Sequence, residues 1–98
     1  MATFISTVQF TNQGMKDIKS TCKRAHAVEA AAEKMGVKVK DIYWTLGSHD
    51  GVIIMEAPDE ETATALMLQI GSHGNVQTQT ARAFTSAEME TILAKVSG

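Results

Sequence analysis

The sequence predicts a single α+β domain in which strands and helices follow one another as β-α-β-β-α-β, with a further helix at the C-terminus. Three observations predict it. Four segments are rich in β-branched and aromatic residues, two longer segments between them have helical periodicity, and the second and third strands adjoin as a hairpin. The 98 residues suffice for one modest hydrophobic core, so residues 1–98 are taken as one domain.

The first strand is predicted over Thr3–Phe10. Because side chains alternate along a strand, Phe4, Val8 and Phe10 share one face and Ile5 lies on the other. The polar segment Thr11–Gly14 is expected to break this strand.

A long helix is predicted from about Met15 to Met35, and Gly36 provides a left-handed stop directly after it. Residues spaced by three and four mark the face of this helix that is expected to be buried. The predicted stripe is Ile18, Cys22, Ala25, Val28, Ala32 and Met35.

The hairpin is the most informative stretch of the chain. Strands are predicted over Val37–Leu46 and Gly51–Ala57, joined by a turn rich in Gly, Ser, His and Asp. Trp44 is expected in the core, on the same side as the neighbouring apolar residues of these strands.

The remaining elements have clear end signals. Asp59 is expected to cap a second helix that runs to about Ile70, and a fourth strand follows over Val76–Phe84. Thr85 and Glu88 form a capping box for the last helix. This order of elements is the ferredoxin-like arrangement, with two helices on one face of a four-stranded antiparallel sheet.

The other face of this sheet is unusually apolar. Strand periodicity places four apolar side chains on the face without helices: Ile5, Tyr43, Val52 and Ile54. The same face is expected to carry Thr7, Gln9, Thr45, Glu56, Gln77 and Gln79. Apolar area of this extent is uncommon on a soluble monomer. The sequence therefore predicts a homo-oligomer, in the first place a face-to-face dimer similar to the dimeric α/β barrels.

The hairpin also shows a resemblance to a known family. The run Tyr-Trp-Thr-Leu-Gly-Ser-His-Asp at 43–50, the run Val-Ile-Ile-Met-Glu-Ala-Pro-Asp-Glu-Glu at 52–61 and the segments 74–80 and 82–85 resemble the GYD-domain family. The resemblance covers nearly the whole chain and implies a small dimeric α/β barrel of mostly unassigned function. Its motif residues map to Gly47 and Asp50, with His49 where the family name suggests tyrosine.

Composition narrows the possible partners. The net charge of −2 gives no indication of nucleic acid binding, and no long apolar stretch or basic leader suggests a membrane segment or secretion. The single cysteine, Cys22, fits a reducing compartment, so a cytoplasmic location is expected. Cys22, His26 and Glu29 have helical spacing, but a metal site needs further ligands, so we expect neither a metal nor a cofactor.

Four residues are candidates for binding a small molecule: His49, Asp50, Tyr43 and Glu56. A histidine can exchange protons near neutral pH, and a neighbouring carboxylate can orient it. Asp50 can equally well fix the turn by accepting hydrogen bonds from backbone amides. His73 and Arg82 are further side chains able to orient a ligand.

Three functions are compatible with these features. The first is a small-molecule-binding homo-oligomer whose cavity lies between the two sheets. The second is a structural or regulatory oligomer without ligand chemistry, and the third is a cofactor-independent enzyme similar to oxygenases or isomerases. The fold alone does not choose among them, and no catalytic motif is present.

Overall fold

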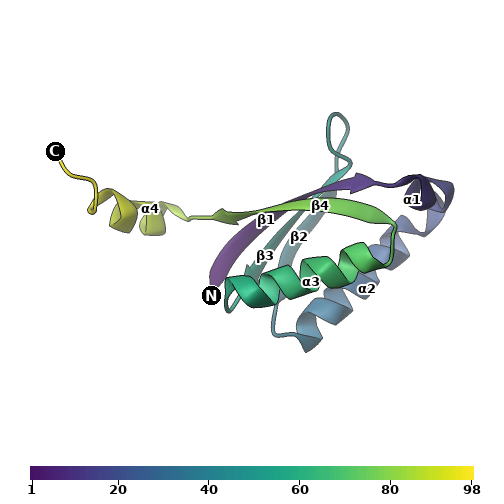
Figure 1. The fold of residues 1–98 in the computed structure, drawn as a ribbon, viewed down its shortest axis with the longest axis horizontal. Coiled ribbons are helices and arrows are strands. Elements are labelled where there is room, and N and C mark those ends of the chain that lie inside the picture. Colours follow the sequence, from purple (N-terminus) through teal and green to yellow (C-terminus); the bar gives the residue numbers. More distant parts are fainter.

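The computed structural model describes residues 1–98, and Figure 1 shows the order of its elements. The strands and helices are β1 (Ala2–Phe10), α1 (Asn12–Lys16), the 3₁₀ helix η1 (Ile18–Ser20), α2 (Thr21–Lys34), β2 (Lys38–Trp44), β3 (Gly51–Ala57), α3 (Glu60–Ser72), β4 (Val76–Ala83) and α4 (Ser86–Leu93). The predicted ferredoxin-like fold is confirmed, including the added C-terminal helix.

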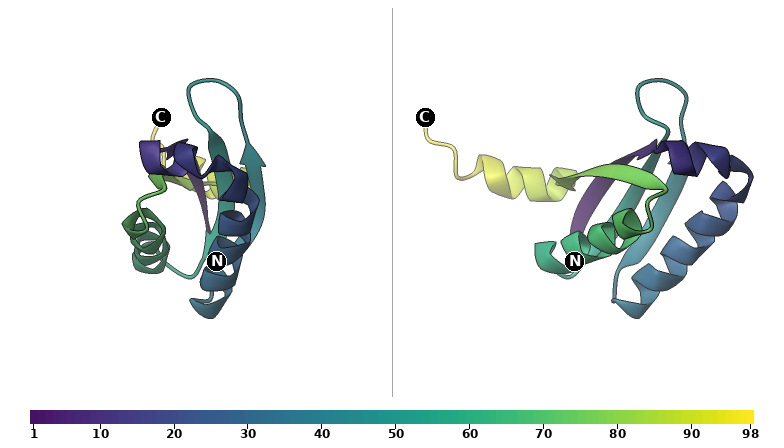
Figure 2. Two further views of the ribbon diagram at one scale, coloured as in Figure 1. Left: turned by 90° about the vertical axis from the view of Figure 1, so that its right-hand side faces the viewer. Right: turned by 45° about the vertical axis from the view of Figure 1, so that its right-hand side comes forward.

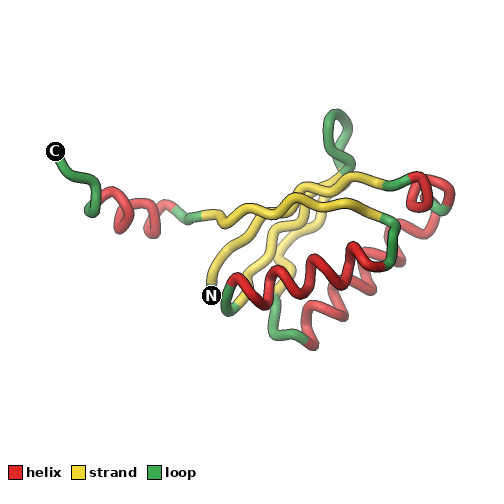
Figure 3. The backbone as a smooth tube through the Cα atoms, viewed as in Figure 1, coloured by secondary structure: helices red, strands yellow, loops and turns green.

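The strands form one antiparallel sheet in the order β2-β3-β1-β4. Figure 3 shows the strands side by side, with α2 and α3 along one side of them. One core cluster joins residues of α2 and α3 to a single face of the sheet: Phe4, Ala32, Val37, Met55, Ala57, Ala63, Leu66, Met67 and Ile70. Both helices therefore cover the same face.

The predicted division of residues between the two faces is confirmed for the residues of the strands, whereas Thr45, predicted on the open face, lies past the end of β2. Ile5 pairs with Ile54 and with Ala81, and Tyr43 pairs with Val52, so these side chains share the face without helices. We call this surface the open face. A register shift between Val39 and Asp41 inserts one extra residue into β2, so Val39 and Ile42 both lie on the helix-covered face.

The long helix predicted over 15–35 is wrong in its first half. The chain forms α1, η1 and α2 instead, because Asp17 leaves helical geometry at φ −114° and ψ 40° and interrupts the periodicity. Thr11 caps α1, so the segment expected only to break the strand begins a helix. In the predicted buried stripe, Ala32 is buried and Ala25, Val28 and Met35 are half-buried, but Cys22 is exposed.

The other end signals are confirmed. Gly36 has the left-handed φ of 77° after α2. The Asp59 carboxylate accepts a hydrogen bond from the Thr62 backbone N–H at 2.7 Å, and this bond lowers the pKa of Asp59. In α4, Thr85 and Glu88 form the predicted reciprocal capping box. The Thr85 backbone N–H, then Arg82, hold the pKa of Glu88 below its ordinary value.

The capping box allows a direct prediction for α4. Thr85→Ala removes the hydroxyl that accepts the Glu88 backbone N–H at 3.2 Å, and we expect the helix to lose about 1 kcal/mol of stability. Because α4 extends from the body, this loss acts on the helix itself. Chemical shifts of residues 86–93 measure it, and unchanged helical shifts would show that the cap does not hold the helix.

Candidate functional site

A groove of about 400 Å³ lies between α2, α3 and the helix-covered face of the sheet. Its walls are mostly apolar and come from all three parts of the fold. Val28 and Ala31 line it from α2, Ile70 from α3, and Ile42 and Ile53 from the sheet. Figure 2 shows the two helices diverging over the sheet, which is consistent with this opening.

Polar side chains gather at one end of the groove. The pairing of Phe10 with Val76 and of Trp44 with Gly51 brings these four strand ends together. The start of α2 and the end of α3 lie at the same end, as Figure 2 shows. The polar residues lining the groove from these segments are Thr21, Arg24, Asp50, Gln69, His73 and Asn75.

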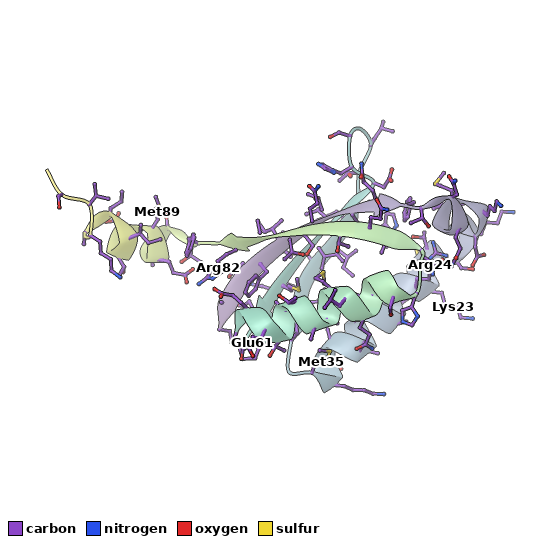
Figure 4. All side chains as sticks on the ribbon, viewed as in Figure 1. Lys23, Arg24, Met35, Glu61, Arg82 and Met89 are labelled. Atoms are coloured by element: carbon purple, nitrogen blue, oxygen red, sulfur yellow. The ribbon has the colours of Figure 1, made fainter.

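Two contacts fix this polar end. The Trp44 indole N–H donates to the Thr21 hydroxyl at 2.9 Å and so ties the end of β2 to the start of α2. Arg24 donates to the Asp17 carbonyl oxygen at 2.7 Å and lies 3.4 Å from the Asp17 carboxylate. Figure 4 labels Arg24 beside the start of β4. Trp44, expected in the core, is 46% exposed because the groove above it is open.

Asp50 lines the groove and also holds the strands together. One of its carboxylate oxygens accepts the Phe10 backbone N–H at 2.9 Å, and its own N–H donates to the Val8 carbonyl oxygen at 2.8 Å. Its other carboxylate oxygen accepts no hydrogen bond within the chain. Asp50 therefore has the structural role that a turn aspartate can have, and one of its carboxylate oxygens has no hydrogen-bond partner.

His49 lies beside Asp50 in the β2–β3 loop but does not line the groove. The loop is closed by the Thr45 hydroxyl, which donates to the His49 carbonyl oxygen at 2.7 Å. The His49 Nδ1 atom is buried and has no hydrogen-bond partner. No other buried side-chain nitrogen or oxygen atom in the chain lacks a hydrogen-bond partner. Such unpaired buried atoms are uncommon in folded proteins.

Tyr43 and Glu56 lie on the open face by strand parity, and Tyr43 is also among the residues that line the groove. The Tyr43 side chain is 54% exposed, and Glu56 is half-buried near the opposite end of β3 from Asp50. Asp50 and Glu56 are six positions apart along extended chain, a distance of about 20 Å. The structure therefore does not bring the four candidate residues into one cluster.

Two further observations concern the metal site and the membrane segment that were considered from the sequence. His26 and Glu29 are both exposed on α2, with the His26 Nδ1 atom 3.4 Å from the Glu29 carboxylate. No helix in the structure combines the length and the apolar character needed to cross a membrane.

Comparison with solved structures finds several proteins with a similar fold. A feast or famine regulatory protein from M. tuberculosis, complexed with L-methionine, matches 88% of the chain with a TM-score of 0.66 and 14% identity. The chain spans about half of that protein, 52% of its length. A protein from Thermus thermophilus matches 88% of the chain and 96% of its own length, with a TM-score of 0.57 and 23% identity.

An ACT domain protein from Streptococcus pneumoniae also matches, over 85% of the chain and 90% of its own length, with a TM-score of 0.50 and 17% identity. No curated protein matches the chain by sequence. The family model of the GYD domain matches residues 4–93, which include the hairpin, the groove and all of α4. The chain therefore belongs to the GYD-domain family.

Proposed function

We propose that the protein is a homo-oligomer that binds a small molecule in the groove between α2, α3 and the sheet. The groove itself carries this proposal. Its volume of about 400 Å³ falls within the range of small-molecule sites, and its apolar walls with a few polar groups at one end are typical of them.

The arrangement of the groove favours an amphipathic ligand. An apolar body fits against Val28, Ala31 and Ile53, and a polar head fits near His73 and Asp50. The free carboxylate oxygen of Asp50 favours a hydrogen-bond donor or a positive charge on that head. The complex of the similar M. tuberculosis regulatory protein with L-methionine supports small-molecule binding by this type of fold.

The proposal of a homo-oligomer depends on the open face. Tyr43 is 54% exposed and Ile5 is 37% exposed there, with Val52 and Ile54 beside them and no helix over them. A second copy of the same face is self-complementary and buries all four side chains twice. His49, Tyr43 and Glu56 are proposed to line the space between the copies.

Titration with the neutral fluorescent amine N-phenyl-1-naphthylamine, whose N–H can donate a hydrogen bond, tests the groove. Trp44 is the single tryptophan and lines the groove, so a bound probe should accept energy from it. Ala31→Leu fills part of the groove, and we expect it to weaken binding roughly tenfold or more.

Ala30→Leu is the matched control, because Ala30 lies on the same helix and is exposed away from the groove. Both variants replace one good helix former by another. Equal weakening by the two variants, or the absence of saturable binding to the wild type, would contradict a ligand site in the groove. An oligomer without such binding would favour a purely structural or regulatory role.

A further inference from the structure

The two edges of the sheet differ in how well they are protected against pairing with another strand. The edge strands are β2 and β4. β2 carries Lys38, Lys40 and Asp41 and has an irregular register, and charges and bulges of this kind discourage further pairing. β4 pairs with β1 in one unbroken register, and its segment Val76–Ala81 has no charged residue and no proline. β4 is therefore the edge to which a further strand can be added.

The pairing of β4 with β1 shows which of its backbone groups are free. The Thr11 backbone N–H donates to the Asn75 carbonyl oxygen at 3.1 Å, and these residues are opposite each other in the register that continues along both strands. Hydrogen-bonded and non-hydrogen-bonded pairs alternate along antiparallel strands. The Phe10 N–H fits this alternation, because it donates to the Asp50 carboxylate on the side of β3. The residues of β4 whose backbone groups point away from β1 are therefore Val76, Thr78, Thr80 and Arg82.

A second groove, of about 420 Å³, lies beside this edge between α3 and β4, and we call it the edge groove. Its residues from α3 follow one stripe of that helix, with Leu68 among them 69% exposed. Residues opposite each other in paired strands have side chains on the same face. Every second side chain of a strand added to β4 would therefore point into the edge groove. Its lining residues are Phe4, Glu60, Ala63, Thr64, Met67, Leu68, Thr78, Thr80 and Arg82.

One end of the edge groove is acidic. Glu60 lines it, Glu61 follows at the surface, and neither forms an ion pair within the chain. Figure 4 labels Glu61 at the start of α3 and Arg82 at the end of β4. The Arg82 charge is already paired with the Glu88 carboxylate at 3.3 Å, and the chain has no other lysine or arginine after Lys40 until Lys95. The acidic end therefore favours a partner with a positive charge.

We propose that the edge groove binds an extended segment of another protein, which adds to β4 as a further antiparallel strand. Backbone hydrogen bonds to Thr78 and Thr80 hold the segment, and the groove beside Phe4 and Leu68 selects apolar side chains at alternate positions. An antiparallel segment begins where β4 ends. A lysine or arginine at the start of the segment then lies beside Glu60.

A second copy of β4 fits this edge less well. The only charged residue of β4 is Arg82, and antiparallel pairing would bring the opposite, uncharged end of the second β4 beside Glu60. The edge groove is separate from the open face, because it lies on the side of the sheet that α3 covers. The inference therefore does not depend on the proposed oligomer or on its ligand.

Hydrogen exchange in the intact protein tests the strand addition, with the peptide acetyl-Lys-Thr-Val-Thr-Val-Thr-amide as the probe. We expect the amides of Thr78 and Thr80 to exchange freely without the peptide, and more than roughly tenfold slower with the peptide at millimolar concentration. Gln77 and Gln79 are the internal control, because their amides face β1 and should exchange slowly in both states. Slow exchange of Thr78 and Thr80 without the peptide would show that a second copy occupies the edge and would overturn the proposal. Free exchange that the peptide leaves unchanged would overturn it as well.

A charge reversal tests the acidic end. We expect Glu60→Lys to weaken binding of the fluorescently labelled peptide by about fivefold, measured by anisotropy. Glu61→Lys is the matched control, because it makes the same change on the same helix but outside the edge groove. A peptide with glutamate in place of lysine should bind Glu60→Lys better than the wild type. Equal weakening by the two variants would overturn the position of the positive charge.

A proline substitution tests the backbone pairing. Thr78→Pro removes an N–H that points away from β1, so the sheet should keep its own hydrogen bonds while peptide binding weakens by about fivefold. Thr78→Ala removes the same side chain but keeps the N–H, and should bind the peptide more tightly than Thr78→Pro. Equal binding by the two variants, with slow exchange of the amides that face β1 in both, would overturn the addition of a strand to β4.

Discussion

Replacing Ile54 by aspartate is expected to convert the oligomer into monomers or to prevent folding. Ile54 lies in the middle of β3 on the open face, between Ile5 on one neighbouring strand and Asp41 on the other. In the proposed dimer the new carboxylate would be buried without a partner, at a cost of about 3 kcal/mol, which corresponds to roughly a hundredfold weaker association. Sedimentation velocity over a range of protein concentrations measures the change.

Leu68→Asp provides the matched control. Leu68 is exposed on α3, away from the open face, so the same loss of an apolar side chain should leave the oligomer intact. A wild type that is a stable monomer at micromolar concentration would contradict the open-face dimer. Equal dissociation constants for Ile54→Asp and the wild type would contradict it as well.

The second large effect is expected at Gly14, where the chain packs too closely for a side chain. Gly14 is buried in α1, and a methyl group at this position would overlap the carbonyl oxygen of Asn75. Since that oxygen also accepts the Thr11 backbone N–H at 3.1 Å, backbone must move to make room. We expect Gly14→Ala to lower the free energy of unfolding by about 3 kcal/mol in urea denaturation.

Gly71→Ala should change stability in the opposite direction. Gly71 lies in α3 with no atom near the position of a new methyl group, and alanine favours the helix by roughly 0.5 kcal/mol or more. A Gly14→Ala protein as stable as Gly71→Ala would show that the approach of α1 to β4 does not limit this position. Because Asn75 lines the groove, Gly14→Ala should also weaken probe binding.

The face of the sheet on which each strand side chain lies could be predicted from the sequence, because successive side chains of a strand point to opposite faces. Ile5, Tyr43, Val52 and Ile54 share the open face as expected. The caps at Asp59 and Thr85 could also be predicted, since each depends on residues within one turn. The break at Asp17 could not, because the apolar spacing continues through it.

The groove could not be predicted, because its volume depends on how far α2 and α3 diverge over the sheet. The strand pattern predicts a cavity on the open face, whereas the groove lies on the helix-covered face. One signal was available: α2 faces the sheet largely with small side chains, Ala25 and Ala31 among them, which leave space above Ile42 and Ile53. Asp50 lines this space and His49 does not. This difference depends on the path of the β2–β3 loop in three dimensions, which the sequence pattern does not give.

Native mass spectrometry of the freshly purified protein tests directly whether it is a homo-oligomer that holds a small molecule. We expect ions at even multiples of the 10.5 kDa chain mass that carry an added mass, released as a small organic compound when the protein is denatured. Ions of the bare monomer alone, from a protein that is folded in the same buffer, would contradict both the assembly and the bound ligand.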